Sequence, residues 1–380
     1  MTVDYNGLAA RIAADGKPFG LLSMQSAGSA AFLAAKFPKL LKALYSAEHG
    51  FFGMAGAGER TESAWHPFWN VPIHSLYGEH RKPTGEMLEG VGRMVVDLCD
   101  IGVRCYTYLA TLKNMLEACA AKSIPVTVLD RPIPLGSVVD GPMLKPSYES
   151  FVAPLNVPLC HGMTPGECAV WIAREEKLDL DLDVVRLVGW SHADFSPWPN
   201  FVPPSPAIRS WDSAVAYPLT VFTEAYRAVD CDRQGSMAFR VIGAPWLDTE
   251  RLVRDLAPGL ETCGFGMRPY RYVPSGGEYR GLPLNGILFS VNRGGDGCYP
   301  VTAGVLVLTA LIQRHHDKMA VNARPEWLDK LFGSTELSDT LRCGSLDDLF
   351  TGWIEAQEKY LATKVDLYRQ EAGGKVGRNI

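Results

Sequence analysis

The sequence lacks the short motifs that mark the common nucleotide-binding and serine-hydrolase folds. It contains neither the phosphate-binding pattern G-x-x-x-x-G-K-[ST] nor the G-x-S-x-G turn that presents a nucleophilic serine. The nearest approach to the dinucleotide pattern G-x-G-x-x-G begins at Gly56, where Thr61 stands in place of the third glycine. We therefore predict no nucleotide cofactor, and we interpret the glycine-rich stretch 50–58 as a flexible loop over a site.

Cysteine pairs and spaced histidine ligands are also missing. The 9 cysteines are odd in number and include no C-x-x-C pair. They are typical of buried thiols in a reducing compartment, and not of a disulfide framework or a zinc site. The pattern H-E-x-x-H does not occur among the 8 scattered histidines. We predict no metal cofactor.

Long apolar runs and an excess of positive charge are absent as well. No run approaches the roughly 18 apolar residues of a transmembrane helix, and the N-terminus has no signal-peptide pattern. The 37 Lys+Arg against 42 Asp+Glu give a net charge of −5, unlike the basic excess of nucleic-acid binders. We expect a cytoplasmic protein that binds neither membranes nor nucleic acid. The sequence gives no basis for predicting an oligomeric state.

The sequence does contain an alternation of apolar runs and amphipathic segments. Apolar runs typical of buried strands stand at 19–24, 40–45, 93–98, 125–129 and 184–189. Residues 107–122 carry apolar side chains at helical spacing. Strand, helix and strand in succession form a βαβ unit. We therefore predict an α/β fold with a Rossmann-like parallel sheet covered by helices on both faces.

The length of 380 residues suggests two domains at about 150 residues each. Prolines crowd 194–206, which excludes a helix or a central strand there. We place the boundary in this stretch, with a catalytic domain over 1–200 and a smaller α+β domain over 201–380 that closes a cleft. Helices are predicted at 303–315 and 345–369.

Polar side chains follow three of the predicted strands. Glu48 and His49 follow the second run, Asp100 follows the third, and Asp130 and Arg131 follow the fourth. Each acid alone is typical of a helix cap, but ligands of parallel sheets bind where the carboxyl ends of the strands meet. Paired carboxylates without a metal or nucleotide suit glycoside cleavage, in which one acid protonates the leaving oxygen.

Several longer motifs are similar to those of the NamZ-type exo-β-N-acetylmuramidase family. They are SAEHGFFGMAGAGE (46–59), SLYGEHRKPTGEML (75–88), DIGVRCYTYLATL (100–112), VLDRPIPLG (128–136), GPML (141–144), HGMTPGE (161–167), PPSP (203–206) and GAPW (243–246). These motifs occur in family order, so the sequence resembles members of this family.

The resemblance implies a Rossmann-like domain without a nucleotide, a smaller C-terminal domain and an active site between them. It also implies release of N-acetylmuramic acid from the non-reducing end of peptidoglycan fragments, with Glu48 as the catalytic acid. We expect Asp100 or Asp130 to steer water or stabilise positive charge, and Arg104 or Arg131 to hold the lactyl carboxylate. The side chains assigned to substrate binding are His49, Arg104, Tyr106, Tyr108, Arg131, His161 and Glu224.

Two features of the sequence qualify this assignment. Thr164 and Glu167 have the spacing of a capping box, which favours a structural role for Glu167. After Glu224, the family usually continues with a G-T-N stretch and a G-R-G-T turn, whereas this chain has bulky and charged residues at 225–227 and 230–234. An alternative is therefore a relative that binds a cell-wall sugar without turnover. A nucleotide-dependent oxidoreductase is a third reading, and it predicts a binding signal with NAD.

Overall fold

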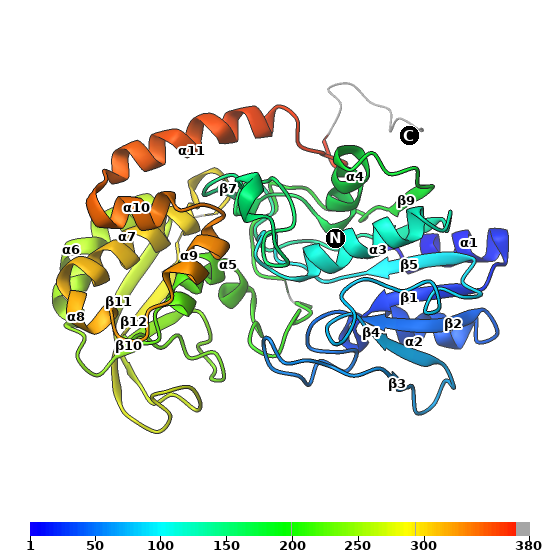
Figure 1. Cartoon of the computed structure of the whole chain (residues 1–380), viewed down its shortest axis with the longest axis horizontal. Coiled ribbons are helices and arrows are strands. Elements are labelled where there is room, and N and C mark those ends of the chain that lie inside the picture. Colours follow the sequence, from blue (N-terminus) through cyan, green and yellow to red (C-terminus); the bar gives the residue numbers. More distant parts are fainter. Residues whose placement is uncertain (199, 293, 370–380) are drawn as a thin grey trace.

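The computed structural model describes residues 1–198, 200–292 and 294–369, and Figure 1 shows them as two lobes. The first lobe contains a seven-stranded sheet in the order β3-β4-β2-β1-β5-β6-β9. Its strands are β1 (Phe19–Ser23), β2 (Leu41–Ser46), β3 (Ala64–Trp65), β4 (Pro72–Ser75), β5 (Arg93–Asp97), β6 (Val126–Leu129) and β9 (Leu182–Val185). Neighbouring strands are parallel except for β3 and β4, which confirms the predicted sheet.

Helices cover both faces of this sheet. Along β1 every residue is buried, as expected for a central parallel strand between two helical layers. Successive strand residues point to opposite faces, so Leu21 belongs to one core cluster and Leu22 to the other. The first cluster includes residues of α1 (Tyr5–Asp15) and α2 (Ser29–Lys36). The second includes residues of α3 (Tyr108–Ala120) and α4 (Pro165–Glu175).

The second lobe is built on a three-stranded antiparallel sheet in the order β10-β12-β11. Its strands are β10 (Val241–Ala244), β11 (Phe265–Tyr272) and β12 (Leu284–Val291). Its helices are α5 (Trp211–Thr220), α6 (Thr249–Thr262), α7 (Pro300–Arg314), α8 (His316–Met319), α9 (Pro325–Phe332), α10 (Glu336–Cys343) and α11 (Leu346–Leu361). The predicted fold class, an α/β domain followed by a smaller mixed one, is confirmed.

Two short strands and several irregular segments join the lobes. β7 (Val139–Asp140) pairs with β8 (Cys160–His161), and the 3-10 helix η3 (Val221–Ala225) follows α5. Helix α11 runs from the second lobe back to the first (Figure 1), where Tyr360 donates a hydrogen bond to the carbonyl of His161 at 2.7 Å. No helix among the described residues is long and apolar enough to cross a membrane.

Two predicted elements end elsewhere than expected. The helix predicted at 345–369 ends at Leu361, because the chain then turns toward the first lobe and the Tyr368 hydroxyl donates to Asp130 Oδ2 at 2.5 Å. The strand predicted at 184–189 ends at Val185. Val188 forms instead an isolated antiparallel bridge with Thr2, so this residue pairs with the N-terminal segment and does not extend β9.

Candidate active site

Glu48 lies just beyond the carboxyl end of β2, and hydrogen bonds hold both of its carboxylate oxygens. Oε1 accepts from the backbone N–H of Gly58 at 2.6 Å, and Oε2 accepts from the hydroxyl of Thr107 at 2.5 Å. The residue is 8% exposed and forms no ion pair with any residue that the structure describes. Glu48 is therefore an oriented carboxyl group with no fixed positive partner.

A strained turn brings the glycine-rich loop back over Glu48. His49 and Gly50 both have left-handed backbone conformations, with φ of 72° and 73°. This conformation is uncommon for a histidine, and strain of this kind gathers at functional sites. The ring Nδ1 of His49 hydrogen-bonds to the carbonyl of Ala55 at 2.9 Å, which fixes the loop whose Gly58 reaches Glu48. His49 thus shapes the loop beside Glu48.

Thr107 occupies the cap position of α3 without capping the helix. A threonine at this position normally accepts a hydrogen bond from the first helical turn. No such bond forms here, and the hydroxyl is directed to Glu48 instead. A hydroxyl can donate to a carboxylate or accept from a carboxylic acid. Thr107 is therefore able to hold Glu48 in either protonation state.

Asp100 follows β5 and is the second carboxyl group of this region. It is partly exposed, and its Oδ1 accepts from the backbone N–H of Gly102 at 2.8 Å. Burial raises the pKa of Asp100 to about 7, although the N–H groups of Gly102 and Ile101 oppose the rise. Asp100 therefore gains and loses its proton near neutral pH.

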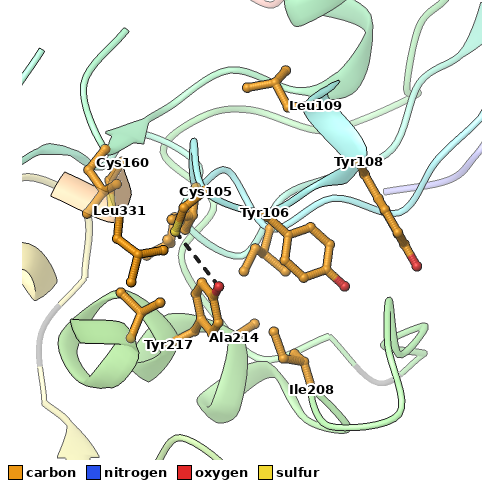
Figure 2. Packing of buried hydrophobic residues seen from close by; sticks show 14 of the residues in the cluster. Cys105, Tyr106, Tyr108, Leu109, Cys160, Ile208, Ala214, Tyr217 and Leu331 are labelled. Carbon is orange, nitrogen blue, oxygen red and sulfur yellow. Dashed lines mark hydrogen bonds between the residues drawn. The ribbon is translucent and has the colours of Figure 1, made fainter. Parts of the chain in front are cut away.

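Tyr106 and Tyr108 lie close to both carboxyl groups. Their ring centres are 4.9 Å apart, and Figure 2 shows them at the start of α3 with Tyr217 of the second lobe below. Burial raises the pKa of both phenols, and the charges of Glu48 and Asp100 add to the rise. The Tyr108 hydroxyl donates to a backbone carbonyl at 2.6 Å. The buried Tyr106 hydroxyl has no hydrogen-bond partner among the described residues.

These contacts bring together four of the side chains that the sequence assigned to the site: Glu48, Asp100, Tyr106 and Tyr108. The phenol of Tyr106 and the two carboxyl groups offer donors and acceptors to a hydroxyl-rich ligand. The location of these side chains is also that of a ligand site in a parallel sheet, because the segments after the carboxyl ends of β2 and β5 supply all four of them.

Asp130 does not share this position. It is fully buried, and it accepts from the N–H groups of Arg131 and Gly166 and from the hydroxyls of Thr164 and Tyr368. Four donors and no accessible surface leave no room for a substrate atom. These contacts indicate a structural role, which differs from the predicted catalytic one: Asp130 bonds the start of α4 and the C-terminal segment to the end of β6.

The side chain of Arg131 also forms its polar contacts with other residues of the protein. Its guanidinium forms a two-point ion pair with the fully buried Asp97, at 2.5 and 2.8 Å, where β5 ends. It also donates to the carbonyl of Ala27 at 2.6 Å. This pair fills the point between β1 and β5 where strand order reverses, the usual ligand crevice of doubly wound sheets. These contacts indicate a structural role for Arg131, which differs from the predicted role in binding a substrate carboxylate.

Arg104 and His161 are buried without any accessible surface. The Arg104 guanidinium donates to the carbonyls of Pro142 (2.9 Å), Val157 (2.7 Å) and Phe332 (2.6 Å). Phe332 ends α9, so Arg104 ties the first lobe to a helix terminus of the second. Burial lowers the pKa of His161 to about 3, and its Nδ1 accepts from a backbone N–H at 3.2 Å. These contacts indicate structural roles for both side chains, which differ from the predicted roles in substrate binding.

Glu224 lies in the second lobe, on η3, and forms an ion pair with Arg233 at 2.6 Å. Both residues line a pocket of ≈ 520 Å³. The pocket wall includes the segment in which this chain departs from the family pattern. Its other residues, Arg324 and Trp327 among them, carried no signal in the sequence.

Glu167 forms the predicted capping box with Thr164 at the start of α4. With His192 and Asp366 it also forms a cluster whose possible metal-ligand atoms lie within 4.8 Å of one another. Hydrogen bonds to Glu167 Oε1 from His192 Nε2 and from the N–H of Leu367, both at 2.8 Å, account for this cluster without an ion.

Sequence reasoning missed Thr107 and Gly58, the two residues that position Glu48. Thr107 stands between Tyr106 and Tyr108 in the matched motif, and its place before a predicted helix suggested only a cap. The structure places the glycine-rich loop against Glu48, but no pattern in the sequence identifies which N–H contacts this residue.

Asp100 makes the protein less stable as the pH rises, and Asp100→Asn is expected to remove this effect. An unfolded aspartate has a pKa near 3.9, so the raised pKa of Asp100 means that stability falls between about pH 4 and 7. Above pH 7 the neutral variant should be more stable by about 2 kcal/mol, half of the full linkage value because the side chain is partly exposed. Urea unfolding at pH 5 and 8 measures the change, and an equal difference at both pH values would contradict it.

Two family models match almost the whole chain. The N-terminal model of exo-beta-N-acetylmuramidase NamZ matches residues 20–212, and the C-terminal model matches 215–368. Peptidoglycan beta-N-acetylmuramidase NamZ of Bacillus subtilis is 32% identical over 329 residues, which are 85% of this chain and 78% of that protein. Two solved DUF1343 family proteins of Bacteroides fragilis share the fold over 91% of this chain and 92% of theirs. Their TM-scores are 0.81 and 0.70, at 26% and 24% identity. The predicted membership is confirmed: the chain belongs to the NamZ family of exo-β-N-acetylmuramidases.

Proposed function

We propose that this protein is a glycosidase that releases N-acetylmuramic acid from the non-reducing end of peptidoglycan fragments. Family membership supports this activity. The observation that carries it is that two carboxyl groups, Glu48 and Asp100, lie close enough to Tyr106 for both charges to act on its phenol. Two carboxyl groups are the usual machinery of glycoside hydrolysis.

In this proposal Glu48 protonates the departing glycosidic oxygen. A general acid must lose its proton and recover it within each turnover. The hydroxyl of Thr107 can follow that change, since it donates to the carboxylate and accepts from the acid. The N–H of Gly58 holds the other oxygen throughout. Glu48 thereby keeps one orientation during the reaction.

Asp100 serves as the base that orients and deprotonates the attacking water. A base is most effective when its pKa lies near the working pH, and burial brings that of Asp100 to about 7. Its partial exposure gives water a path to the carboxylate. The Tyr106 phenol supplies a hydrogen-bonding partner for a sugar hydroxyl between the two carboxyl groups.

Entry of a sugar ring requires the loop 50–60 to move. Glu48 is 8% exposed and Tyr106 is 7% exposed, so the site is closed in this conformation. The loop itself is largely exposed, and Gly53 and Gly58 adopt left-handed conformations that tolerate rearrangement. Opening breaks the Gly58 contact to Glu48, and closure over the sugar restores it and excludes water.

The test is hydrolysis of the disaccharide in which N-acetylmuramic acid is β-linked to N-acetylglucosamine. We expect equimolar release of the two sugars. The pH profile of kcat/KM should be bell-shaped, because Glu48 must be protonated while Asp100 is ionised, and its dependence on Asp100 is expected near pH 7. Asp100→Asn should lose this dependence together with most of the rate. Binding of the disaccharide without any product would instead identify the protein as a non-catalytic sugar-binding relative.

We also propose that the protein acts in the cytoplasm, on fragments recycled from the cell wall. The support is chemical: all nine cysteines are free thiols, and eight are buried, as is usual for proteins of a reducing compartment. Immunodetection in fractionated cells locates the protein, and recovery with secreted or periplasmic proteins would overturn this assignment.

A further inference from the structure

The pocket of the second lobe is a site separate from Glu48 and Asp100. It measures ≈ 520 Å³, within the range of pockets that bind small molecules. Its wall comes from η3 and the residues after it, from the loop 274–279, and from the start of α9. Neither carboxyl group of the candidate active site lines it.

Tyr217 does not line the pocket, but it has neighbours both in the candidate active site and in the pocket wall. The ring of Tyr217 meets that of Tyr106 edge-on, with 6.2 Å between their centres (Figure 2). On its other side Tyr217 lies near the ion pair of Glu224 and Arg233, whose charges act on its hydroxyl. Contacts of Tyr217 therefore link residues of the candidate active site to residues of the pocket wall.

The acidic side chains of the pocket wall already have donors. Glu224 pairs with Arg233 at 2.6 Å, and Glu278 lies 3.7 Å from Arg227. Asp230 Oδ1 accepts hydrogen bonds from the hydroxyl of Tyr272 and from the backbone N–H of Asp232. Asp232 Oδ2 accepts a hydrogen bond from the backbone N–H of Met237. These contacts leave the acids little capacity to bind a cation.

Two donors of the pocket wall have no acceptor. Arg324 Nε and Trp327 Nε1 are buried and lack a hydrogen-bond partner among the described residues. Arg324 stands over the Trp327 ring, 5.6 Å from its centre, and one of its terminal nitrogens donates to the carbonyl of Glu224 at 2.9 Å. It forms no ion pair with a described carboxylate. A buried donor without an acceptor costs about 1–3 kcal/mol, a cost that a bound anion removes.

We propose that this pocket receives a carboxylate of the substrate, with Arg324 Nε and Trp327 Nε1 as its hydrogen-bond donors. The assignment rests on the proposed function, because it names the part of the substrate that the second lobe recognises. It also replaces the role predicted for Arg104 and Arg131, both of which are occupied elsewhere. A muramic sugar offers this chemistry from two sources: its own lactyl group, or the acidic residues of a peptide attached to it.

Calorimetric binding of three sugars tests the assignment and separates the sources. The probes are N-acetylglucosamine, which lacks the carboxylate, N-acetylmuramic acid, and N-acetylmuramyl-L-alanyl-D-glutamate. If the lactyl group is the source, N-acetylmuramic acid binds at least about tenfold more tightly than N-acetylglucosamine, as expected for a charge-assisted contact. If the peptide is the source, only the peptide-bearing sugar gains this advantage.

Two variants connect the preference to the pocket. Trp327→Phe removes the indole N–H together with one ring of the indole, and Arg324→Gln removes the charge; each is expected to reduce the preference about tenfold or more. Trp190→Phe is the matched control, because its indole N–H is also buried and unpartnered but lies outside the pocket. The wild-type preference should persist in this control.

A wild-type protein without carboxylate preference overturns the assignment, and so do folded variants at positions 324 and 327 that keep it. Sugar release is measured separately on the disaccharide. Release without carboxylate preference overturns the pocket assignment alone, and carboxylate binding without release overturns the proposed hydrolysis alone.

Discussion

Glu48→Gln is expected to lower kcat on the disaccharide by about 10²–10⁴-fold, the usual contribution of a general acid. The amide has nearly the same shape as the carboxyl group, and its oxygen can still accept from Gly58 or Thr107. The substitution therefore removes the transferable proton and little else. The melting temperature should change by no more than a few degrees, and KM should stay within a few-fold of the wild-type value.

The control for this substitution is Glu62→Gln, which makes the same chemical change at an exposed position after the same loop. It should retain wild-type kcat. A Glu48→Gln variant that keeps more than a tenth of the wild-type rate would exclude Glu48 as the general acid. Loss of both activity and folding would be detected by the melting temperature.

Arg104→Met is expected to destabilise the protein by about 3 kcal/mol, the largest effect on stability that we predict for a single side chain. The substitution leaves three buried carbonyl groups without their donor, at about 1 kcal/mol or more for each. One of the three ends α9 of the second lobe, so the contact between the lobes is weakened along with the first lobe itself.

Urea unfolding measures this change, and Arg186→Met, at an exposed position, is its control. Arg104→Lys should recover only part of the loss, because one ammonium group cannot reach acceptors that a guanidinium fork spans. If Arg104→Met is as stable as the wild type, the buried guanidinium does not stabilise the contact between the lobes.

The sequence predicted the parallel sheet because its signal is local. The apolar runs that became β1, β5 and β6 are buried on both faces and stand out against their polar flanks. The capping box of Thr164 and Glu167 is equally local, since both members lie within one helical turn. The position of Glu48 after β2 follows from the same strand pattern.

The local sequence does not distinguish an acidic residue of the candidate site from one with a structural role. Asp100 and Asp130 both follow a buried strand and look alike in the sequence. They differ because Asp130 meets Thr164 and Tyr368, and the latter stands 238 residues away. Asp100 meets only the N–H groups of its own loop. Tertiary partners of this kind cannot be inferred from strand ends.

The arginines illustrate the same point. Arg104 and Arg131 stand at strand ends where a carboxylate-binding residue is plausible, but folding brings the carbonyl of Phe332 to one and Asp97 to the other. The unpartnered donors that line the pocket of the second lobe belong to Arg324 and Trp327, in a part of the sequence with no recognisable motif. Only the packing of the second lobe reveals them.

The most direct test of the central claim is a crystal structure of the Glu48→Gln variant with the intact disaccharide bound. We expect the glycosidic oxygen within about 3.2 Å of the side-chain amide at position 48. We also expect a sugar hydroxyl on the phenol of Tyr106, and Asp100 within reach of the water that attacks the anomeric carbon. A disaccharide bound with its glycosidic bond away from position 48 would exclude Glu48 as the general acid.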